Sequence, residues 1–415
     1  RANQYDTEAA RAMIEAAGGA IVDSPLDADV ALFNSCAVTA AAEADLRQEV
    51  RRAANANARI RSVVMGCASA RDDGTIAALP GVSDVIGGAD LVVLAAALGI
   101  DPALAAGGPA VQTGSRALLR VQDGCDEHCT FCATTLARGA HRSRPADDLV
   151  REAQALAGSH PEIVITGIHI GSYGSERGSS LGALVERLVR EVPRVRFRLT
   201  SIEATEVDAR LCELLTSEPA RVAPHLHAPL QSGSDRVLKR MGRHWYSAAG
   251  YASAAETVAA RCRVFALGAD VITGFPGETD DDHAATVALV ESLPFTYLHV
   301  FPYSARPGTA AGNLGHGVPA AVSRERAAAL RAIGEEKAAA HRAARAGGAA
   351  DVVVLGDAAR REGLTEDYLS VALADPSMPR RSRFSARLVA RVDDRSPVTE
   401  VRLLAVEASQ CQPSI

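Results

Sequence analysis

Three cysteines with the spacing C-x3-C-x2-C, Cys125, Cys129 and Cys132, are the strongest chemical signal in the sequence. Thiolates on so short a loop can bind three irons of a 4Fe–4S cluster, because soft sulfur ligands suit iron–sulfur chemistry. The fourth iron then has no protein ligand and can bind an external chelator. The alternative is a structural zinc site completed by His128 or His141. We favour the cluster because the motif directly follows a strand-like run that opens a predicted βα barrel, where functional residues gather at strand ends.

Two further cysteines, Cys36 and Cys67, fit a second site. Each directly follows a short apolar run that predicts a strand. In an open parallel sheet, residues just past the carboxyl ends of neighbouring strands converge on one crevice. Two thiolates are too few for a cluster, and the helix predicted at Thr7–Ala17 requires a preceding strand. We expect that strand, with a third cysteine at its end, to lie upstream of Arg1. The alternative is that both cysteines are buried apolar thiols.

Alternating helical and strand-like segments must position these cysteines. Residues 1–104 alternate helical periodicity with short apolar runs, which is typical of an open parallel α/β domain. Residues 111–340 continue this alternation and predict a partial parallel (β/α)6 barrel. Residues 341–408 change to short alternating strands and predict a small all-β domain. The strand-like runs of the barrel are Leu118–Gln122, Ile163–Gly167, Val195–Ser201, His225–Leu230, Val264–Thr273 and Tyr297–Tyr303.

Length and composition limit the class of protein. The chain has 415 residues, 47% hydrophobic and 23% charged, with a formal net charge of −6 and eight cysteines. These values exclude a disordered or fibrous protein and predict two or three domains. The cysteines are too sparse for a disulfide framework, and the longest apolar run, Leu91–Ile100, is too short to cross a bilayer. We therefore expect a soluble, cytoplasmic protein with no membrane partner. Three cysteines are interpreted as ordinary thiols: Cys212, Cys262 and Cys411.

Basic and aromatic residues near the C-terminus suggest how a polyanion could be bound. The net negative charge provides no global positive field, so such a partner would have to contact local patches. Two aromatic residues there, Tyr368 and Phe384, could stack on unpaired bases. The alternative is a solvated charged face. The densest basic patch comprises Arg380, Arg381, Arg383 and Arg387.

Several ordered motifs resemble one enzyme family. The three-cysteine motif resembles that of radical S-adenosylmethionine (SAM) enzymes. The N-terminal segment Asn3–Glu8, together with the residues around Cys36 and Cys67, resembles the N-terminal domain of methylthiotransferases. The opening segment is most similar to the branch that acts on N6-threonylcarbamoyladenosine at position 37 of tRNA. The later segments that resemble this family, the last of them its C-terminal TRAM domain, are His227–Ser234, Gly274–Thr279, Phe301–Thr309 and Glu362–Tyr368.

The resemblance implies a chemistry and its cofactors. A cluster on the three-cysteine loop binds SAM, whose reductive cleavage gives a 5′-deoxyadenosyl radical that removes hydrogen from adenine C2. An auxiliary cluster on Cys36, Cys67 and a cysteine upstream of Arg1 carries the sulfur or methylthio group, and a second SAM donates the methyl group. The implied cofactors are therefore two 4Fe–4S clusters and SAM. The implied partners are the anticodon loop of tRNA, an electron donor and a sulfur donor.

Residues at the ends of three predicted barrel strands are candidates for SAM contacts. Gly167 ends the second strand and lets the backbone approach a ligand closely. Ser201 and Glu203 close the third strand, and Gln231 closes the fourth. Each could equally cap a strand end. The motif residues themselves, Cys125, Cys129 and Cys132, are the predicted catalytic centre.

Three rival functions stay open on the sequence. The same chemistry could act on isopentenyladenosine at position 37 of tRNA or on an aspartate of a ribosomal protein. A different class is a non-catalytic iron–sulfur protein that binds RNA and senses redox state.

Overall fold

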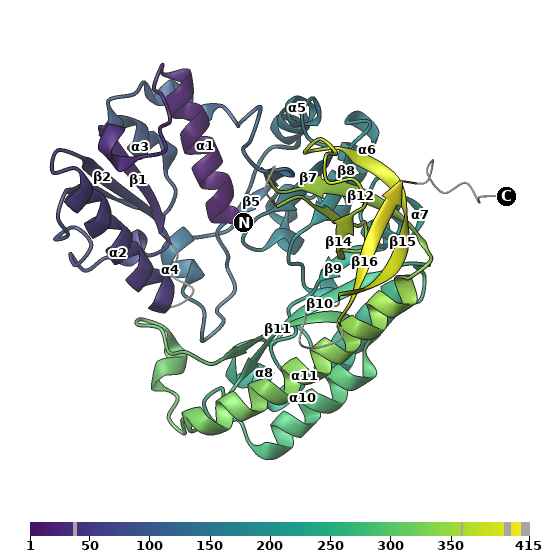
Figure 1. Ribbon diagram of the computed structural model, residues 1–415. Coiled ribbons are helices and arrows are strands. Elements are labelled where there is room, and N and C mark those ends of the chain that lie inside the picture. The colour runs from purple at the N-terminus through teal and green to yellow at the C-terminus, as the bar shows by residue number, and fades with distance from the viewer. Residues whose placement is uncertain (36–39, 358–359, 394–399, 408–415) are drawn as a thin grey trace.

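The computed structural model describes residues 1–35, 40–357, 360–393 and 400–407 (Figure 1). Its first part is a three-stranded parallel sheet in the order β1-β2-β3. The strands alternate with helices because apolar residues on both faces of the sheet require cover. The elements are α1 (Ala2–Ala16), β1 (Val30–Ser35), α2 (Ala40–Ala56), β2 (Arg61–Gly66), β3 (Val82–Gly87) and α3 (Leu91–Leu98).

Strand β2 shows how the sheet divides its side chains between two cores. Val63 and Met65 pack with Met13 of α1 and Leu94 of α3 on one face. Val64, the residue between them, packs on the other face with Val50 of α2. This alternation follows from the two-residue period of a strand. The predicted α/β arrangement is confirmed, and Figure 1 shows α1 and α2 on opposite sides of the sheet.

Helix α1 begins at Ala2 rather than at Thr7 as predicted. Its first five residues include three that are buried, namely Ala2, Tyr5 and Asp6. Asp6 forms ion pairs with Arg120 and Arg138. Helix prediction from sequence relies on the spacing of apolar residues, and a buried aspartate does not contribute to that pattern. The predicted helix therefore starts too late.

Six parallel strands form the partial barrel, in two sheets of order β4-β7-β8 and β11-β10-β9. Parallel bridges from Phe197 to Val222 and from Ser201 to His227 join the two sheets. The predicted partial barrel is confirmed. Its strands are β4 (Ala117–Arg120), β7 (Glu162–Thr166), β8 (Arg196–Leu199), β9 (His225–His227), β10 (Ala266–Thr273) and β11 (Phe295–Pro302).

Helices cover the outside of the barrel, and α10 and α11 lie side by side along one flank (Figure 1). Phe197 and Leu199 of β8 belong to the large apolar core that these helices share with the strands. The helices are α5 (Ala146–Ala157), α6 (Leu181–Glu191), α7 (Ala209–Ser217), α9 (Ala248–Ala259), α10 (Asp280–Ser292) and α11 (Ala320–Arg345). Short elements at the strand ends are β5 (Gln122–Asp123), α4 (Thr134–Arg138), β6 (Arg142–Ser143) and α8 (Asp235–Arg240).

A closed five-stranded barrel in the order β12-β13-β14-β16-β15 follows α11. The small all-β fold is confirmed, although β13 was not predicted as a strand because it has only three residues, one of them glycine. The strands are β12 (Ala349–Leu355), β13 (Glu362–Leu364), β14 (Ser370–Leu373), β15 (Arg383–Asp393) and β16 (Glu400–Glu407). Within the described ranges, no helix combines the length and the apolar character needed to span a bilayer.

A buried ion network joins the two barrels. Glu162 of β7 accepts hydrogen bonds from Nε of Arg196 (2.6 Å) and Nε of Arg198 (2.8 Å), and all three side chains are fully buried. Arg198 also donates to the carbonyl oxygens of Thr365 (2.9 Å) and Glu366 (3.0 Å) in the C-terminal barrel. Burial alone would raise the pKa of Glu162, but the arginines hold it well below its ordinary value.

Replacing Glu162 by alanine should destabilise the protein strongly. The variant would leave the guanidinium groups of Arg196 and Arg198 buried without their counter-charge. Breaking a buried pair in this way costs about 3–5 kcal/mol in the free energy of unfolding. Denaturant unfolding followed by circular dichroism measures it. The control is Glu186→Ala in the exposed pair with Arg210, which should cost less than about 1 kcal/mol. Equal costs for the two variants would contradict the interpretation.

Candidate functional site

The three-cysteine loop follows β5 and is tied to the barrel by backbone hydrogen bonds. Gly124 opens the loop at a φ of +72°, and a Cβ there would lie 1.9 Å from the carbonyl oxygen of Ala140. Only glycine fits this approach. Cys125 N donates to Gly139 O, and Thr130 N donates to Met241 O beyond α8. The loop therefore has a fixed course, and its three cysteines are all partly exposed.

Arg243 and Glu203 form a buried pair beside Cys129. Nη1 of Arg243 lies 3.6 Å from Cys129 Sγ, and its Nη2 donates to Glu203. Burial raises the pKa of the Cys129 thiol to about 12, against the opposing effect of Arg243. The thiolate therefore needs a further positive charge, and a bound metal ion deprotonates a coordinating thiol. Three thiols on one short loop are a donor set whose chemistry fits an iron–sulfur cluster with one open iron.

His169 stands beside Cys125 on the other side of the loop. Its Nδ1 lies 3.8 Å from Cys125 Sγ, and its Nε2 lies 2.6 Å from a carboxylate oxygen of Glu206. Burial by itself would lower the pKa of His169, but the hydrogen bonds with Cys125 and Glu206 raise it to about 10. The third cysteine, Cys132, receives a hydrogen bond on Sγ from the backbone N–H of Thr134, at 3.4 Å.

The predicted SAM-contacting residues lie past the ends of three neighbouring strands. Glu203 reaches the cysteines through Arg243. A Cβ on Gly167 would lie 2.8 Å from the carbonyl oxygen of Gln122, so this loop depends on the close backbone approach that was expected. Ser201 is exposed and Gln231 is buried with a φ of +62°. Contact of these four residues with SAM stays a prediction.

Cys67, of the predicted second site, directly follows β2 and contacts the helix that comes after the three-cysteine loop. Its Sγ is 3.4 Å from Nε of Arg138, the last residue of α4, which directly follows that loop. It is also 3.7 Å from Oδ1 of Asn3 in α1. Cys36 is outside the described residues. The structure thus brings one cysteine of the second predicted set into contact with the last residue of α4, six positions after Cys132.

Two residues of the site were not predicted from the sequence. Arg243 follows α8, and His169 follows β7, with no motif spacing that links either to a cysteine. The only local signal is their place just beyond a barrel element, where functional residues are expected.

The predicted RNA-binding arginines contact the protein itself. Arg380 Nε donates to Ser115 Oγ at 2.9 Å, and Arg381 Nε donates to Gly114 O at 3.3 Å. Arg383 Nε donates to a carboxylate oxygen of Asp351 at 2.9 Å. A contact with RNA by these side chains stays a prediction.

Tyr368 lies apart from those arginines, against the strands of the partial barrel. Its ring stacks on His225 at a centroid distance of 4.4 Å, and its hydroxyl accepts a hydrogen bond from Arg1 at 2.7 Å. A role of this half-buried ring in RNA binding also stays a prediction.

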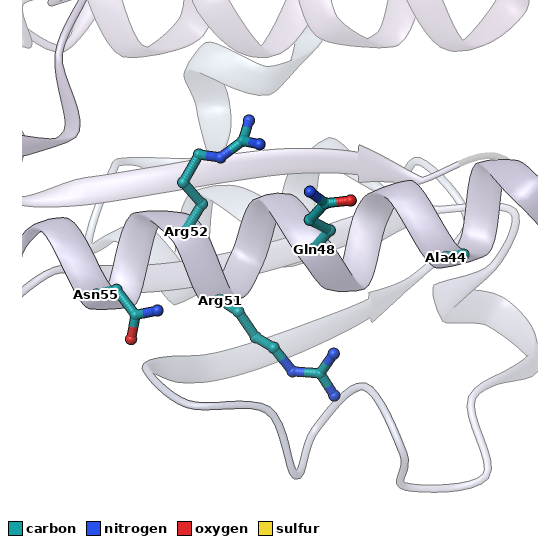
Figure 2. Close-up of a pocket in the computed structure, with 5 residues that line it drawn as sticks. All are labelled: Ala44, Gln48, Arg51, Arg52 and Asn55. Atoms are coloured by element: carbon teal, nitrogen blue, oxygen red, sulfur yellow. The ribbon is translucent and has the colours of Figure 1, made fainter.

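Surface hollows do not mark the site. One hollow runs along α2 (Figure 2), where the side chains of Arg51 and Arg52 extend to different sides of the helix. A second is lined by the loop 305–313. No cysteine of the described residues lines either of these two hollows.

Replacing Arg243 by glutamine should reduce SAM cleavage. The variant would leave Glu203 buried without its counter-charge and remove the cation nearest to Cys129. Loss of such a supporting residue typically costs about 10–100-fold in metal affinity or activity. The measurement is 5′-deoxyadenosine release together with iron per chain. Arg210→Gln, in an exposed pair, is the control, and equal rates for both variants would contradict the role of Arg243.

Comparison with known proteins gives two family matches. Residues 119–290 match the radical SAM superfamily, and residues 1–88 match the uncharacterized protein family UPF0004. Among solved structures, the radical SAM methyltransferase TsrM from Kitasatospora setae superposes with a TM-score of 0.53 at 14% identity. The superposition covers 68% of this chain and 65% of TsrM. At this identity the likeness concerns the fold alone.

Curated relatives match most of the chain. It is 34% identical to the threonylcarbamoyladenosine tRNA methylthiotransferase MtaB of Bacillus subtilis strain 168, over 81% of this chain and 79% of that protein. The MtaB of Thermotoga maritima is also 34% identical, over 80% and 79%. The tRNA-2-methylthio-N(6)-dimethylallyladenosine synthase of Ralstonia pickettii strain 12J is 32% identical, over 92% and 90%.

Proposed function

The chain belongs to the radical SAM methylthiotransferase family, and from that premise we propose that it modifies tRNA. The proposed reaction converts N6-threonylcarbamoyladenosine at position 37 to its 2-methylthio derivative. Five MtaB proteins at 31–35% identity support this substrate. The observation that supports the proposal is the contact of Cys67 with Arg138, at the end of the short helix that follows the loop of Cys125, Cys129 and Cys132. Methylthiolation needs a sulfur source next to the centre that activates the substrate, and this placement supports it.

An iron–sulfur cluster and SAM are the cofactors that the family implies. When bound, they supply the electron and the 5′-deoxyadenosyl radical that removes hydrogen from adenine C2. In the proposal, Cys125, Cys129 and Cys132 hold the SAM-binding cluster, and Cys67 belongs to a second one. The count of two clusters rests on the family resemblance and on the position of Cys67.

The neighbouring side chains hold and shield this centre. Arg243 places a positive charge beside Cys129 and opposes the rise that burial causes in the pKa of Glu203. His169, held by Glu206, donates towards Cys125 when it is protonated. The loop after Gly167 is fixed because the backbone N–H groups of Ile168 (3.0 Å) and His169 (2.8 Å) donate to Oε1 of Gln122. These contacts fix the site before a ligand arrives.

The inner face of strands β9, β10 and β11 carries polar side chains, which favours a substrate whose adenine bears a polar substituent. The hydroxyl of Tyr297 lies 2.8 Å from Nε2 of His225 and 3.1 Å from Nδ1 of His227. Asp270 lies 3.1 Å from Nε2 of His227 and 3.3 Å from Nδ1 of His299. An apolar isopentenyl chain packed on these groups would exclude water from them without offering a hydrogen bond, so such a surface suits the carboxylate and hydroxyl of a threonylcarbamoyl group better.

A second candidate substrate is isopentenyladenosine at the same tRNA position. The Ralstonia pickettii relative, named for dimethylallyladenosine, matches 92% of the chain and favours it. The polar inner face of β9–β11 favours the first candidate.

Mass spectrometry of tRNA nucleosides from a strain that lacks the gene tests the proposal. We expect N6-threonylcarbamoyladenosine to accumulate and its 2-methylthio derivative to disappear. Loss of 2-methylthio-isopentenyladenosine instead would establish the second candidate. Unchanged levels of both would reject a tRNA substrate and leave a ribosomal-protein aspartate or a non-catalytic redox sensor.

A further inference from the structure

Arg138 connects the two sets of cysteines. It is the last residue of α4, six positions after Cys132, and its side chain is only 1% exposed. The side chain of Arg138 extends from the partial barrel to the N-terminal α/β part, where its Nε donates to Cys67 Sγ at 3.4 Å.

The guanidinium group is held from both sides. Nη2 donates to Oδ1 of Asn3 at 2.6 Å and to Oδ2 of Asp6 at 2.7 Å, both in α1. Nη1 lies 3.6 Å from Asp123, two residues before Cys125. Asp6 is itself paired with Arg120 of β4. Because these partners fix the planar group in orientation, Arg138 is directed towards Cys67 by its environment and not by Cys67 alone.

Nη1 of Arg138 is a buried donor that has no hydrogen-bond partner within the described ranges. Asp123 is beyond hydrogen-bonding distance. Buried charged donors normally find an acceptor, so Nη1, on the side of Asp123, is left free for a further partner. The Nε–H is already directed at Cys67 Sγ and would donate to the sulfurs of a group held there.

We propose that Arg138 is a positioning residue for the second iron–sulfur cluster, with its guanidinium group donating hydrogen bonds to the sulfurs at Cys67. The inference rests on the proposed function, because it requires that Cys67 be a cluster ligand. Hydrogen bonds to cluster sulfurs and nearby positive charge tune the reduction potential of a cluster. Arg138 therefore fixes the second cluster relative to the three-cysteine loop and stabilises its reduced form.

The experiment isolates the second cluster. In the full-length gene product, the triple variant Cys125→Ala, Cys129→Ala, Cys132→Ala removes the first cluster, and the protein is then reconstituted anaerobically with iron and sulfide. Iron and sulfide per chain, the electron paramagnetic resonance spectrum of the reduced protein and its midpoint potential are compared with and without Arg138→Gln. We expect Arg138→Gln to weaken iron binding about 10–100-fold, to alter the spectrum and to lower the midpoint potential.

Two further variants keep the test informative. Arg138→Lys preserves the charge opposite Asp6 and so protects folding, but a single ammonium group cannot reproduce the planar set of contacts. We expect it to fold normally and still to shift the spectrum. The matched control is Arg142→Gln, which removes an exposed arginine 3.7 Å from the same Asp123. It should leave the iron content, the spectrum and the midpoint potential unchanged.

The outcomes separate this inference from the proposed function. Iron, spectrum and potential that are the same in Arg138→Lys, Arg138→Gln and the parent would overturn the role of Arg138 and leave the second cluster in place. A parent triple variant that binds no iron would overturn the second cluster itself, and the role of Arg138 with it.

Discussion

Replacing Cys129 by alanine should abolish SAM cleavage, with release of 5′-deoxyadenosine falling to the level without enzyme. Of the three thiols, Cys129 is the one beside the buried ion pair of Arg243 and Glu203. A cluster with an open iron needs all three thiolates of the motif, because the fourth position is reserved for SAM. Anaerobic turnover with SAM and dithionite, followed by chromatography of the nucleosides, measures the loss.

The control for this variant is Cys212→Ala. Cys212 is buried on α7 in the apolar core, and its Sγ lies 3.2 Å from Nη1 of Arg261 rather than near the motif. Its loss should change stability by about 1 kcal/mol and leave iron content unchanged. Iron content and SAM cleavage that survive in Cys129→Ala would show that the loop does not hold the catalytic cluster.

Replacing Cys67 by alanine should spare SAM cleavage and stop methylthiolation. Cys67 follows a strand of the N-terminal sheet and contacts Arg138 and Asn3, whereas Arg243 and His169 contact Cys129 and Cys125 of the three-cysteine loop. If the proposed assignment holds, removing Cys67 disturbs the sulfur-carrying centre and not the SAM-binding one. The same reaction mixture yields both quantities, as 5′-deoxyadenosine from SAM and as 2-methylthio nucleoside from the tRNA.

Cys262→Ala is the matched control for Cys67→Ala. Cys262 is also partly exposed, but it packs against the apolar core near Leu215, away from the cysteine loops. Both activities should persist in this variant. If Cys67→Ala lost SAM cleavage and methylthiolation to the same extent, the two activities would share one cluster and the assignment of separate sites would be wrong.

Residue type and spacing could predict the cysteine loop and the sheets around it, because these signals are local. C-x3-C-x2-C needs no tertiary information, and the alternation of Val63, Val64 and Met65 follows directly from strand geometry. The partial barrel and the small all-β C-terminal domain are predicted on the same basis and confirmed, and the closure of the latter into a barrel is seen only in the structure.

The supporting residues could not be predicted, because distant segments bring them together. Arg138 is separated by 71 positions from Cys67, and Arg243 by 114 from Cys129. Residues so far apart produce no local sequence pattern from which their contact could be predicted. Likewise, the arginines near the C-terminus suggest a free basic patch, while in the fold Arg380 and Arg381 bind the segment 112–115.

The most direct test of the proposed function is a single reaction analysed by mass spectrometry. The full-length gene product, reconstituted with iron and sulfide, is incubated anaerobically with SAM, a reductant and tRNA that carries N6-threonylcarbamoyladenosine at position 37. We expect 2-methylthio-N6-threonylcarbamoyladenosine in the digested tRNA, formed together with 5′-deoxyadenosine. Formation of 5′-deoxyadenosine while the tRNA nucleoside stays unmodified would contradict it.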